Sequence, residues 1–350
     1  MRSLFATAVA VALASGCASV PVRRVGERRP NDPTWLKASG QQVRFVGSLE
    51  LPEHLGIEKN AFTRFWQWLT GTEASHALYR PFGVAVAADG RVAVTDPGVR
   101  AVRLYLPADG TDLELREGLT NPLAVAFVGE MLAVADGTLA TLVGFDAKTG
   151  ERRPLEWKLP VFSRPTGLAF DAARGRLFVV DAGLHCVHVV SVSGAAPLRI
   201  GARGEALGAF NFPTHVAVDA RGHLFVTDSM NFRVQHFDEQ LEVVGTLGGL
   251  GDTVGDLPRS KGVTIDSRGT LWVVEGAFDV VQGFDTSGEL VGVFGGSGVT
   301  DGRFWLPAGI TSDAQGRIYV ADTWNARVQV FVIEPVPVVP AITARVTEAR

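Results

Sequence analysis

Short apolar runs separated by polar turns recur along most of the chain. In the clearest example, residues 210–237, two apolar runs at 216–218 and 224–227 flank the turn sequence Asp-Ala-Arg-Gly, and an alternating segment follows at 233–237. Runs this short, rich in β-branched residues and bounded by Asp and Gly, are typical of strands in an antiparallel meander. The pattern therefore predicts a unit of short antiparallel strands.

This unit repeats along the chain. An acidic residue closes the second apolar run of each copy, and successive acidic residues lie 40 to 47 positions apart. These residues are Asp96, Asp136, Asp181, Asp228, Glu275 and Asp322. Repeats of this length built from four strands are the signature of β-propeller blades, and the 3.6-residue pattern of helical repeats is absent. We therefore predict an all-β fold, a six-bladed β-propeller of four-stranded antiparallel blades over residues 42–333.

The later copies share the motif Asp-x-x-Asn-x-Arg-Val. It is present as Asp228, Asn231, Arg233 and Val234, and again as Asp322, Asn325, Arg327 and Val328. The motif resembles that of the NHL repeat family, whose domains are six-bladed propellers. The first, second and fifth copies keep only the acidic residue and the strand pattern. The resemblance covers about residues 42–333 and implies, for function, a binding platform or, rarely, an enzyme.

The N-terminal segment has the layout of a signal peptide. Residues 1–16 carry one charge, Arg2, and an apolar stretch at 4–14 that is too short to span a bilayer. The sequence Leu-Ala-Ser-Gly-Cys that follows resembles a bacterial lipobox, with Cys17 as the lipidated first residue of the mature protein. An ordinary signal peptide cleaved nearby is the alternative. On the lipobox interpretation, Ala18 favours a lipid anchor in the outer membrane, facing the periplasm.

Both flanks of the repeats have predicted roles. Residues 17–41 are rich in Arg and Pro and lack apolar periodicity, which indicates a lipidated N-terminus and flexible tether. Residues 42–51 resemble the fourth strand of later copies, and the sixth copy runs out after its third strand. This segment is therefore expected to complete the last blade. Residues 334–350 are expected to form a Pro-rich tail.

A short helical insertion is predicted before the first repeat, at residues 58–71. Four large apolar residues between Phe62 and Leu69 follow the i, i+3, i+4, i+7 spacing of an amphipathic helix, and Gly71 suits its C-terminus. The apolar face is expected to pack on the propeller. The alternative is that Trp68, which lies off this face, is exposed to a partner or a membrane.

Charge and cysteine content narrow the choice of partner. The net charge is −4 and no basic stripe recurs in the repeats, which disfavours nucleic acid. The chain has two cysteines, and once Cys17 is acylated Cys186 has no disulfide partner. Cys186 is expected to be a small buried residue of a strand.

The candidate binding site is the rim where the first strand of each blade begins and the second strand ends, because loops from all blades converge there. The repeated acidic residues are expected to be structural, since Asp before a turn accepts hydrogen bonds from backbone N–H groups. Departures from the repeat are better candidates for binding, and His215 stands where four of the six copies have glycine. The candidate rim residues are His215, Lys261, Asn231, Trp324, Asn325 and Phe278.

The favoured function is a membrane-anchored, envelope-facing binding or scaffold module that captures a protein, peptide or glycan at this rim. The alternative is a metal-dependent lyase or hydrolase resembling the peptidyl-hydroxyglycine amidating lyase, an NHL-like propeller that holds a metal with several rim histidines. Zinc catalysis needs about three converging protein ligands, and His215 alone is placed to contribute one from the first strands. No metal site, cofactor or catalytic residue is therefore predicted, and binding is favoured over catalysis.

Overall fold

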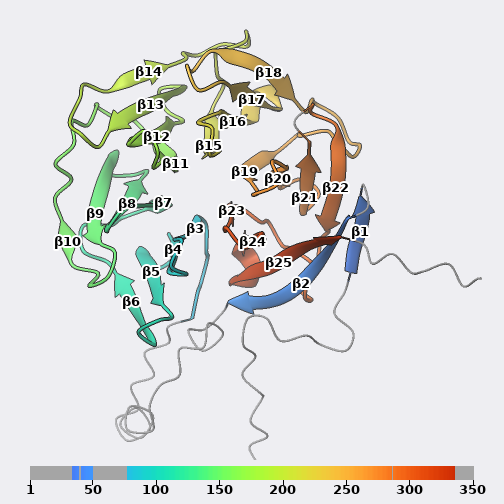
Figure 1. The fold of residues 1–350 in the computed structure, drawn as a ribbon, viewed down its shortest axis with the longest axis horizontal. Coiled ribbons are helices and arrows are strands. Elements are labelled where there is room, and N and C mark those ends of the chain that lie inside the picture. Colours follow the sequence, from blue (N-terminus) through green and yellow to red (C-terminus); the bar gives the residue numbers. More distant parts are fainter. Residues whose placement is uncertain (1–33, 39–40, 50–76, 286, 336–350) are drawn as a thin grey trace, which may run out of the picture.

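Six antiparallel sheets surround a central axis in the computed structural model, which describes residues 34–38, 41–49, 77–285 and 287–335 (Figure 1). In the first five sheets the chain runs from the innermost strand outward and then crosses to the next sheet. This arrangement confirms the predicted all-β, six-bladed propeller of four-stranded antiparallel blades.

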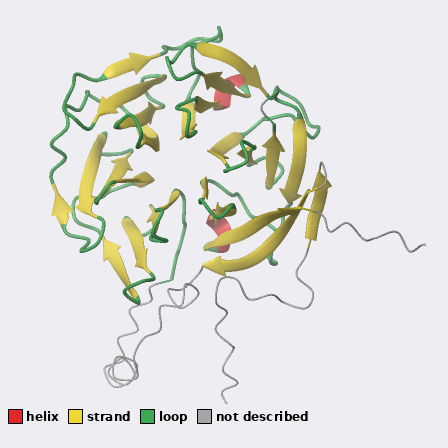
Figure 2. Ribbon diagram, in the orientation of Figure 1, coloured by secondary structure: helices red, strands yellow, loops and turns green. Residues whose placement is uncertain are grey.

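The blades follow one another in chain order. The first blade contains β3 (Val84–Val86), β4 (Val92–Asp96), β5 (Ala101–Leu106) and β6 (Thr111–Leu115). The second contains β7 (Pro122–Val128), β8 (Met131–Asp136), β9 (Thr141–Asp146) and β10 (Arg152–Arg153). The third contains β11 (Pro165–Asp171), β12 (Arg176–Asp181), β13 (Cys186–Ser191) and β14 (Leu198–Ile200). The fourth and fifth contain β15 (Pro213–Val218), β16 (Leu224–Asp228), β17 (Arg233–Phe237) and β18 (Val243–Leu247); and β19 (Ser260–Ile265), β20 (Leu271–Glu275), β21 (Val280–Phe284) and β22 (Leu290–Gly295). Loops and turns connect the strands, and one-turn 3-10 helices follow β16 and β24, at η2 (Ser229–Asn231) and η3 (Thr323–Asn325) (Figure 2).

The sixth blade joins the two ends of the propeller. It consists of β23 (Ile310–Ser312), β24 (Arg317–Asp322), β25 (Arg327–Pro335), β2 (Gln41–Leu49) and β1 (Thr34–Ala38). The predicted closure is confirmed, because β2 pairs antiparallel with β25 from Gln41 opposite Pro335 to Leu49 opposite Val328 (Figure 1). The edge of β25 is thus covered by a strand from the other end of the sequence.

Two predicted boundaries differ from the structure. The sequence analysis assigns residues 17–41 to a flexible tether, but Thr34–Ala38 form β1, which pairs with β2 and adds a fifth strand to the sixth blade. β25 likewise continues to Pro335, two residues beyond the predicted end of the propeller. A strand of five residues has a weak sequence signal, and here it is the exposed edge of β2 that pairs with it.

The remaining terminal predictions lie outside the described residues. These are the signal peptide at 1–16, Cys17, the helical insertion at 58–71 and the tail beyond Pro335. Cys186 is described, and it is fully buried in β13 as expected.

The hydrophobic core of the described residues consists of clusters between neighbouring blades. The cluster between the fifth and sixth blades is rich in aromatic side chains, with Phe45 of β2 in edge contact with Phe331 of β25 at 5.7 Å. The cluster between the second and third blades contains several alanines instead. Each blade therefore buries both faces, which explains why its strands are apolar throughout.

Candidate functional site

The candidate site is the rim at which each innermost strand begins. It comprises the segments that enter the innermost strands and the turns that follow the second strands. The entering segments are 79–83, 120–124, 163–167, 211–215, 258–262 and 305–309, and the turns are 97–100, 137–140, 182–185, 229–232, 276–279 and 323–326. Antiparallel pairing within each blade brings a segment and a turn together at the same end.

The six acidic residues form a buried ring beneath this rim. Each is fully buried, and each accepts hydrogen bonds from backbone N–H groups. Asp136 is representative, since it accepts from Thr120 and Asn121 on the entering segment and from Thr138 and Leu139 in its own turn. Most of the donors thus lie 15 to 18 residues earlier in the sequence, not only in the following turn. The acidic ring holds the entering segments in place, and its oxygens are occupied.

Asn231 and Asn325 belong to the acidic ring rather than to a ligand site. The Nδ2 atom of Asn231 donates to the Oδ2 atom of Asp228 at 2.8 Å and to the carbonyl of Gly204 at 2.9 Å. Asn325 makes the equivalent bonds to Asp322 and Gly298. Because a side-chain amide has two N–H donors, neither amide has one left for a ligand.

The left-handed residue of these turns is also not the asparagine. It is the next residue in each case, Phe232 with φ 58° and Ala326 with φ 53°. The asparagines therefore contribute through their side-chain hydrogen bonds, and the residue after each of them adopts the left-handed conformation.

Arginine completes the network in the fourth and sixth blades. Arg233 pairs with Asp228 and Arg327 pairs with Asp322, each with Nε 2.9 Å from a carboxylate oxygen. Even with Arg327 beside it, burial raises the pKa of Asp322 above its usual range. These buried ion pairs specify the turn, and removing one member would leave the other charge without its partner.

His215 lies at the narrow end of the central channel. Its ring stacks on Phe82 of the first blade, with ring centroids 6.0 Å apart and planes inclined by 27°. With Gly83, Gly167 and Gly309 it lines a cavity of about 40 Å³. Both ring nitrogens are buried and have no hydrogen-bond partner among the described residues. Burial, aided by the charge of Lys261, lowers the pKa of His215 to about 3, so the imidazole is neutral.

The glycines at this level are required by the close approach of neighbouring blades. A Cβ atom on Gly167 would lie 2.7 Å from the carbonyl oxygen of Thr214, and one on Gly309 would lie 2.4 Å from that of Phe82. These distances are shorter than van der Waals contact, so a side chain fits only where the blades separate. His215 occupies such a place at the rim end of the channel.

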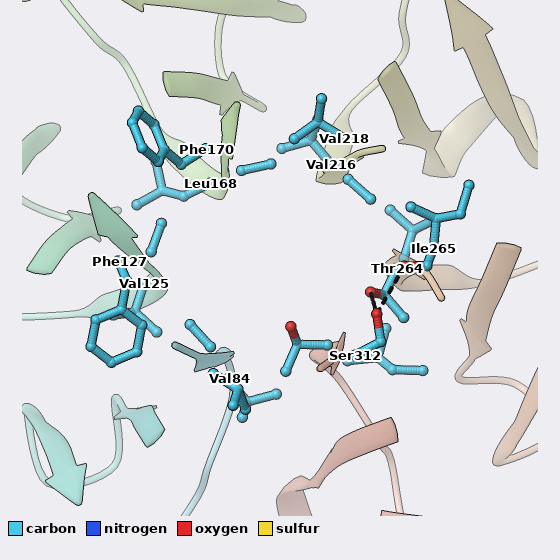
Figure 3. Close-up of a pocket in the computed structure, with 18 residues that line it drawn as sticks. Val84, Val125, Phe127, Leu168, Phe170, Val216, Val218, Thr264, Ile265 and Ser312 are labelled. Carbon is cyan, nitrogen blue, oxygen red and sulfur yellow. Dashed lines mark hydrogen bonds between the residues drawn. The ribbon is translucent and has the colours of Figure 1, made fainter. Parts of the chain in front are cut away.

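Beyond His215 the channel widens to a cavity of about 250 Å³ (Figure 3). Every blade contributes three consecutive residues of its innermost strand, and most of these side chains are apolar. The exceptions gather on one side, where Thr264 and Ser312 share a hydrogen bond of 3.1 Å (Figure 3). The cavity lies toward the face opposite the rim, and His215 lies on its rim side.

Lys261 lies beside this constriction, on the entering segment of the fifth blade. It is partly buried, and its ammonium group makes no ion pair with a described residue. Burial, followed by the nearby charge of Arg259, lowers the pKa of Lys261. A desolvated cation without a partner is unfavourable in the isolated protein and is a recognised mark of a functional position.

Three arginines surround the same opening. Arg80, Arg164 and Arg259 each precede an innermost strand, in the first, third and fifth blades, and all are exposed. Their backbone N–H groups bind the acidic ring, whereas none of their guanidinium groups forms an ion pair within the described part of the chain. We call them the mouth arginines. They are not among the predicted rim residues, although arginine recurs at this position in three of the six copies.

An exposed pair of tryptophans lies next to Arg80. Trp305 and Trp324 are 48% and 47% exposed, and their rings are 5.7 Å apart. The guanidinium of Arg80 lies 4.6 Å from the ring centre of Trp324, a cation–π contact. Trp324 is a predicted site residue, while Trp305 and the exposed Tyr79 beside Arg80 are additions from the structure. Phe278, also predicted, is half-buried in the turn after β20.

The family model for the NHL repeat matches residues 210–237 and 304–331, which contain the two Asp-Asn-Arg networks. The protein is an NHL-repeat β-propeller. The matched segments span the innermost three strands of the fourth blade and the corresponding part of the sixth. Among the described residues of this NHL propeller the helices are single turns, so none of them could span a bilayer.

Solved structures agree on the fold. A Bacteroides thetaiotaomicron protein of unknown function is 16% identical, with a TM-score of 0.61 and coverage of 75% of this chain and 72% of that one. An auxiliary nutrient binding protein from the same organism is 10% identical, with a TM-score of 0.59 and coverage of 73% and 70%. A chain of a nidogen/laminin complex is 16% identical, with a TM-score of 0.55 and coverage of 82% and 97%. At these identities the similarity supports the fold alone.

The described part of the NHL propeller contains no group of three or more His, Cys, Asp or Glu side chains placed to hold a metal. The histidines are dispersed. His185 accepts a hydrogen bond from the backbone of Phe212 on the rim, and His188 lies in β13. His223 and His236 contact each other at 2.9 Å on the opposite face.

Proposed function

We propose that this NHL propeller is a binding module that captures a protein or peptide partner at its rim. The observation that carries the proposal is the exposed tryptophan pair with Arg80 stacked on it. Large aromatic side chains at the surface lose more from exposure than small ones, and at interfaces they often supply much of the binding energy. Arginine beside tryptophan adds a donor-rich, planar cation to the same surface.

The architecture supports this proposal. The acidic ring fixes the backbone of the entering segments, so the side chains above it project from a rigid frame. A rigid binding surface loses little conformational entropy when a partner binds. The nidogen/laminin complex, whose chain has a similar fold, is a precedent for protein binding by such a propeller. A glycan is the other class of partner that an exposed tryptophan pair suits.

The binding proposal is tested by placing a photo-crosslinking amino acid at Trp324 and, as a control, at Leu198. Leu198 is 61% exposed but lies on β14, an outer strand away from the rim. We expect a discrete crosslinked partner from position 324 and not from position 198. The partner should then bind the Trp324→Ala variant at least about tenfold more weakly, with the Leu198→Ala variant unchanged. Equal affinity of both variants would place the binding surface elsewhere.

We further propose that Cys17 carries a lipid anchor that holds the propeller at the outer membrane, facing the periplasm. The support is the lipobox-like sequence before Cys17. Several acyl chains on one residue give stable membrane attachment. The Cys17→Ser variant should fold normally and appear in the soluble fraction. Complete retention of this variant in the membrane fraction would refute the anchor.

A further inference from the structure

The exposed side of the rim carries cationic side chains that form no ion pair with a described residue, although the chain as a whole is acidic. The carboxylates of the acidic ring are buried and occupied by backbone donors. Asp279, the other carboxylate near Lys261, accepts hydrogen bonds from the Ser297 hydroxyl at 2.7 Å and the Leu306 amide at 2.8 Å. The mouth arginines and Lys261 remain without ion pairs. These cations can give charge-assisted hydrogen bonds to an anionic ligand at the channel opening.

At the centre of this surface, the imidazole of His215 lacks a hydrogen-bond partner and the ammonium of Lys261 lacks an ion-pair partner among the described residues. A neutral imidazole has one N–H donor and one acceptor nitrogen, and in His215 both are buried without a partner. Leaving a buried polar group unpaired is unfavourable. The neighbouring ammonium of Lys261 has three donors and no ion-pair partner. One carboxylate, with two acceptor oxygens, would supply an acceptor to each residue.

We propose that the channel mouth formed by His215 and Lys261 binds a carboxylate of an acidic peptide segment in the partner, with the mouth arginines receiving further acidic residues. The inference rests on the proposed binding function and names the chemistry of the partner. The tryptophan pair would hold the apolar residues that flank the carboxylate, since Phe82, the stacking partner of His215, lies two residues from Arg80. The cavity of about 40 Å³ at His215 is too small for a sugar ring.

The test uses a fluorescein-labelled peptide of alternating Glu and Gly residues and its counterpart with Gln in place of Glu, both with amidated C-termini. Binding to the purified protein lacking residues 1–17 is followed by fluorescence anisotropy at low ionic strength. We expect the Glu peptide to bind at least about tenfold more tightly than the Gln peptide, because hydrogen bonds to charged groups are the stronger ones. Equal affinities, or no measurable binding of either peptide, would overturn the inference.

Two variants locate the effect at the mouth. Lys261→Met keeps the length of the side chain and removes its charge, and His215→Phe keeps the ring that stacks on Phe82 and removes its nitrogens. Each should reduce the preference for the Glu peptide several-fold. The control is Lys148→Met, since Lys148 lies in the turn between β9 and β10 on the opposite face and pairs only with exposed Glu130. An equal loss in Lys148→Met would indicate attraction by overall charge and would refute the site.

Inorganic phosphate separates carboxylate binding from general anion binding. Millimolar phosphate is added to the Glu peptide bound to the wild type and, separately, to the Lys261→Met variant. If phosphate displaces the peptide equally well from both proteins, the result would contradict a site shaped for a carboxylate. The two proposals fail separately. If the Trp324 crosslink identifies a partner but the Glu and Gln peptides bind alike, the rim function stands and the carboxylate site does not. If Lys261→Met abolishes the preference for the Glu peptide but no crosslink forms at position 324, the mouth site is supported and the tryptophan surface is not.

Discussion

The rim contains two layers of charge that lie a few residues apart in sequence and behave in opposite ways. In the lower layer, the acidic ring, every carboxylate is buried and accepts hydrogen bonds from the entering segment. All but that of Asp96 also accept a bond from their own turn. In the upper layer, the mouth arginines and Lys261 have no ion-pair partner within the described chain. The backbone of Arg80 itself joins the two layers, because its N–H donates to Asp96 while its guanidinium stacks on Trp324.

The difference separates residues that make the fold from residues that are available to a partner. The lower layer recurs in every blade because each blade has the same backbone donors to satisfy. The upper layer varies from blade to blade, since no internal contact requires one residue type there. The repeat therefore identifies the scaffold, and the variation around it identifies the binding surface. Removing a group from the lower layer should therefore change stability, and removing one from the upper layer should change binding.

The largest loss of stability is expected for Asp228→Ala. This carboxylate accepts hydrogen bonds from the Asn211 amide, Asn231, Arg233 and Gln235, and all would lose their acceptor. Arg233 would be left partly buried and unpaired. We expect the free energy of unfolding to fall by about 2 to 4 kcal/mol in urea titrations. A loss of less than about 1 kcal/mol would mean that the acidic ring does not hold the rim.

Asp136→Ala should have a smaller effect in the same experiment. Asp136 accepts only from backbone N–H groups, and no arginine pairs with it. Its removal leaves neutral donors unpaired but strands no charge, so we expect a loss of about 1 to 3 kcal/mol. If Asp136→Ala proves more destabilising than Asp228→Ala, the arginine networks of the later blades add little to stability.

His215 should make stability depend on pH. Its pKa is about 3 in the folded protein, below the ordinary value of 6.5, so the unfolded chain binds a proton that the folded protein rejects. The free energy of unfolding that this pKa difference contributes is complete above pH 6.5 and is lost as the pH falls toward 3. The free energy of unfolding then changes by up to about 1.4 kcal/mol per pH unit. Between pH 7 and 5.5 the wild type should lose about 1 kcal/mol more than His215→Phe. Parallel pH profiles for the two proteins would show that the imidazole is accessible to water.

The sequence was sufficient to predict the scaffold and insufficient to assemble the upper layer. The acidic residues and turn signals repeat in every copy, and the closing strand β2 resembles the fourth strands it replaces. His215 was identifiable because its position is glycine in four of six copies, and the distances at Gly167 and Gly309 explain that preference.

The other binding residues depend on contacts between different blades. Arg80 precedes the first innermost strand, and Trp324 follows the second strand of the last blade, so only the closed ring brings them to 4.6 Å. No spacing in one repeat encodes that contact. Asn231 and Asn325 illustrate the converse error, since polar side chains in a rim loop were taken as available although both amide hydrogens are used internally.

The smallest change in stability is expected for Lys261→Met, and its sign is informative. The ammonium is partly desolvated without an ion-pair partner, so replacing it with an apolar side chain of similar length removes an unfavourable term. We expect the free energy of unfolding to stay within about 0.5 kcal/mol of the wild type or to rise slightly. The measurement is the same urea titration, with Lys148→Met as the exposed control. A loss above about 1 kcal/mol would show that Lys261 supports the fold through a contact to Glu275 or Asp279, and would move it from the upper layer to the lower.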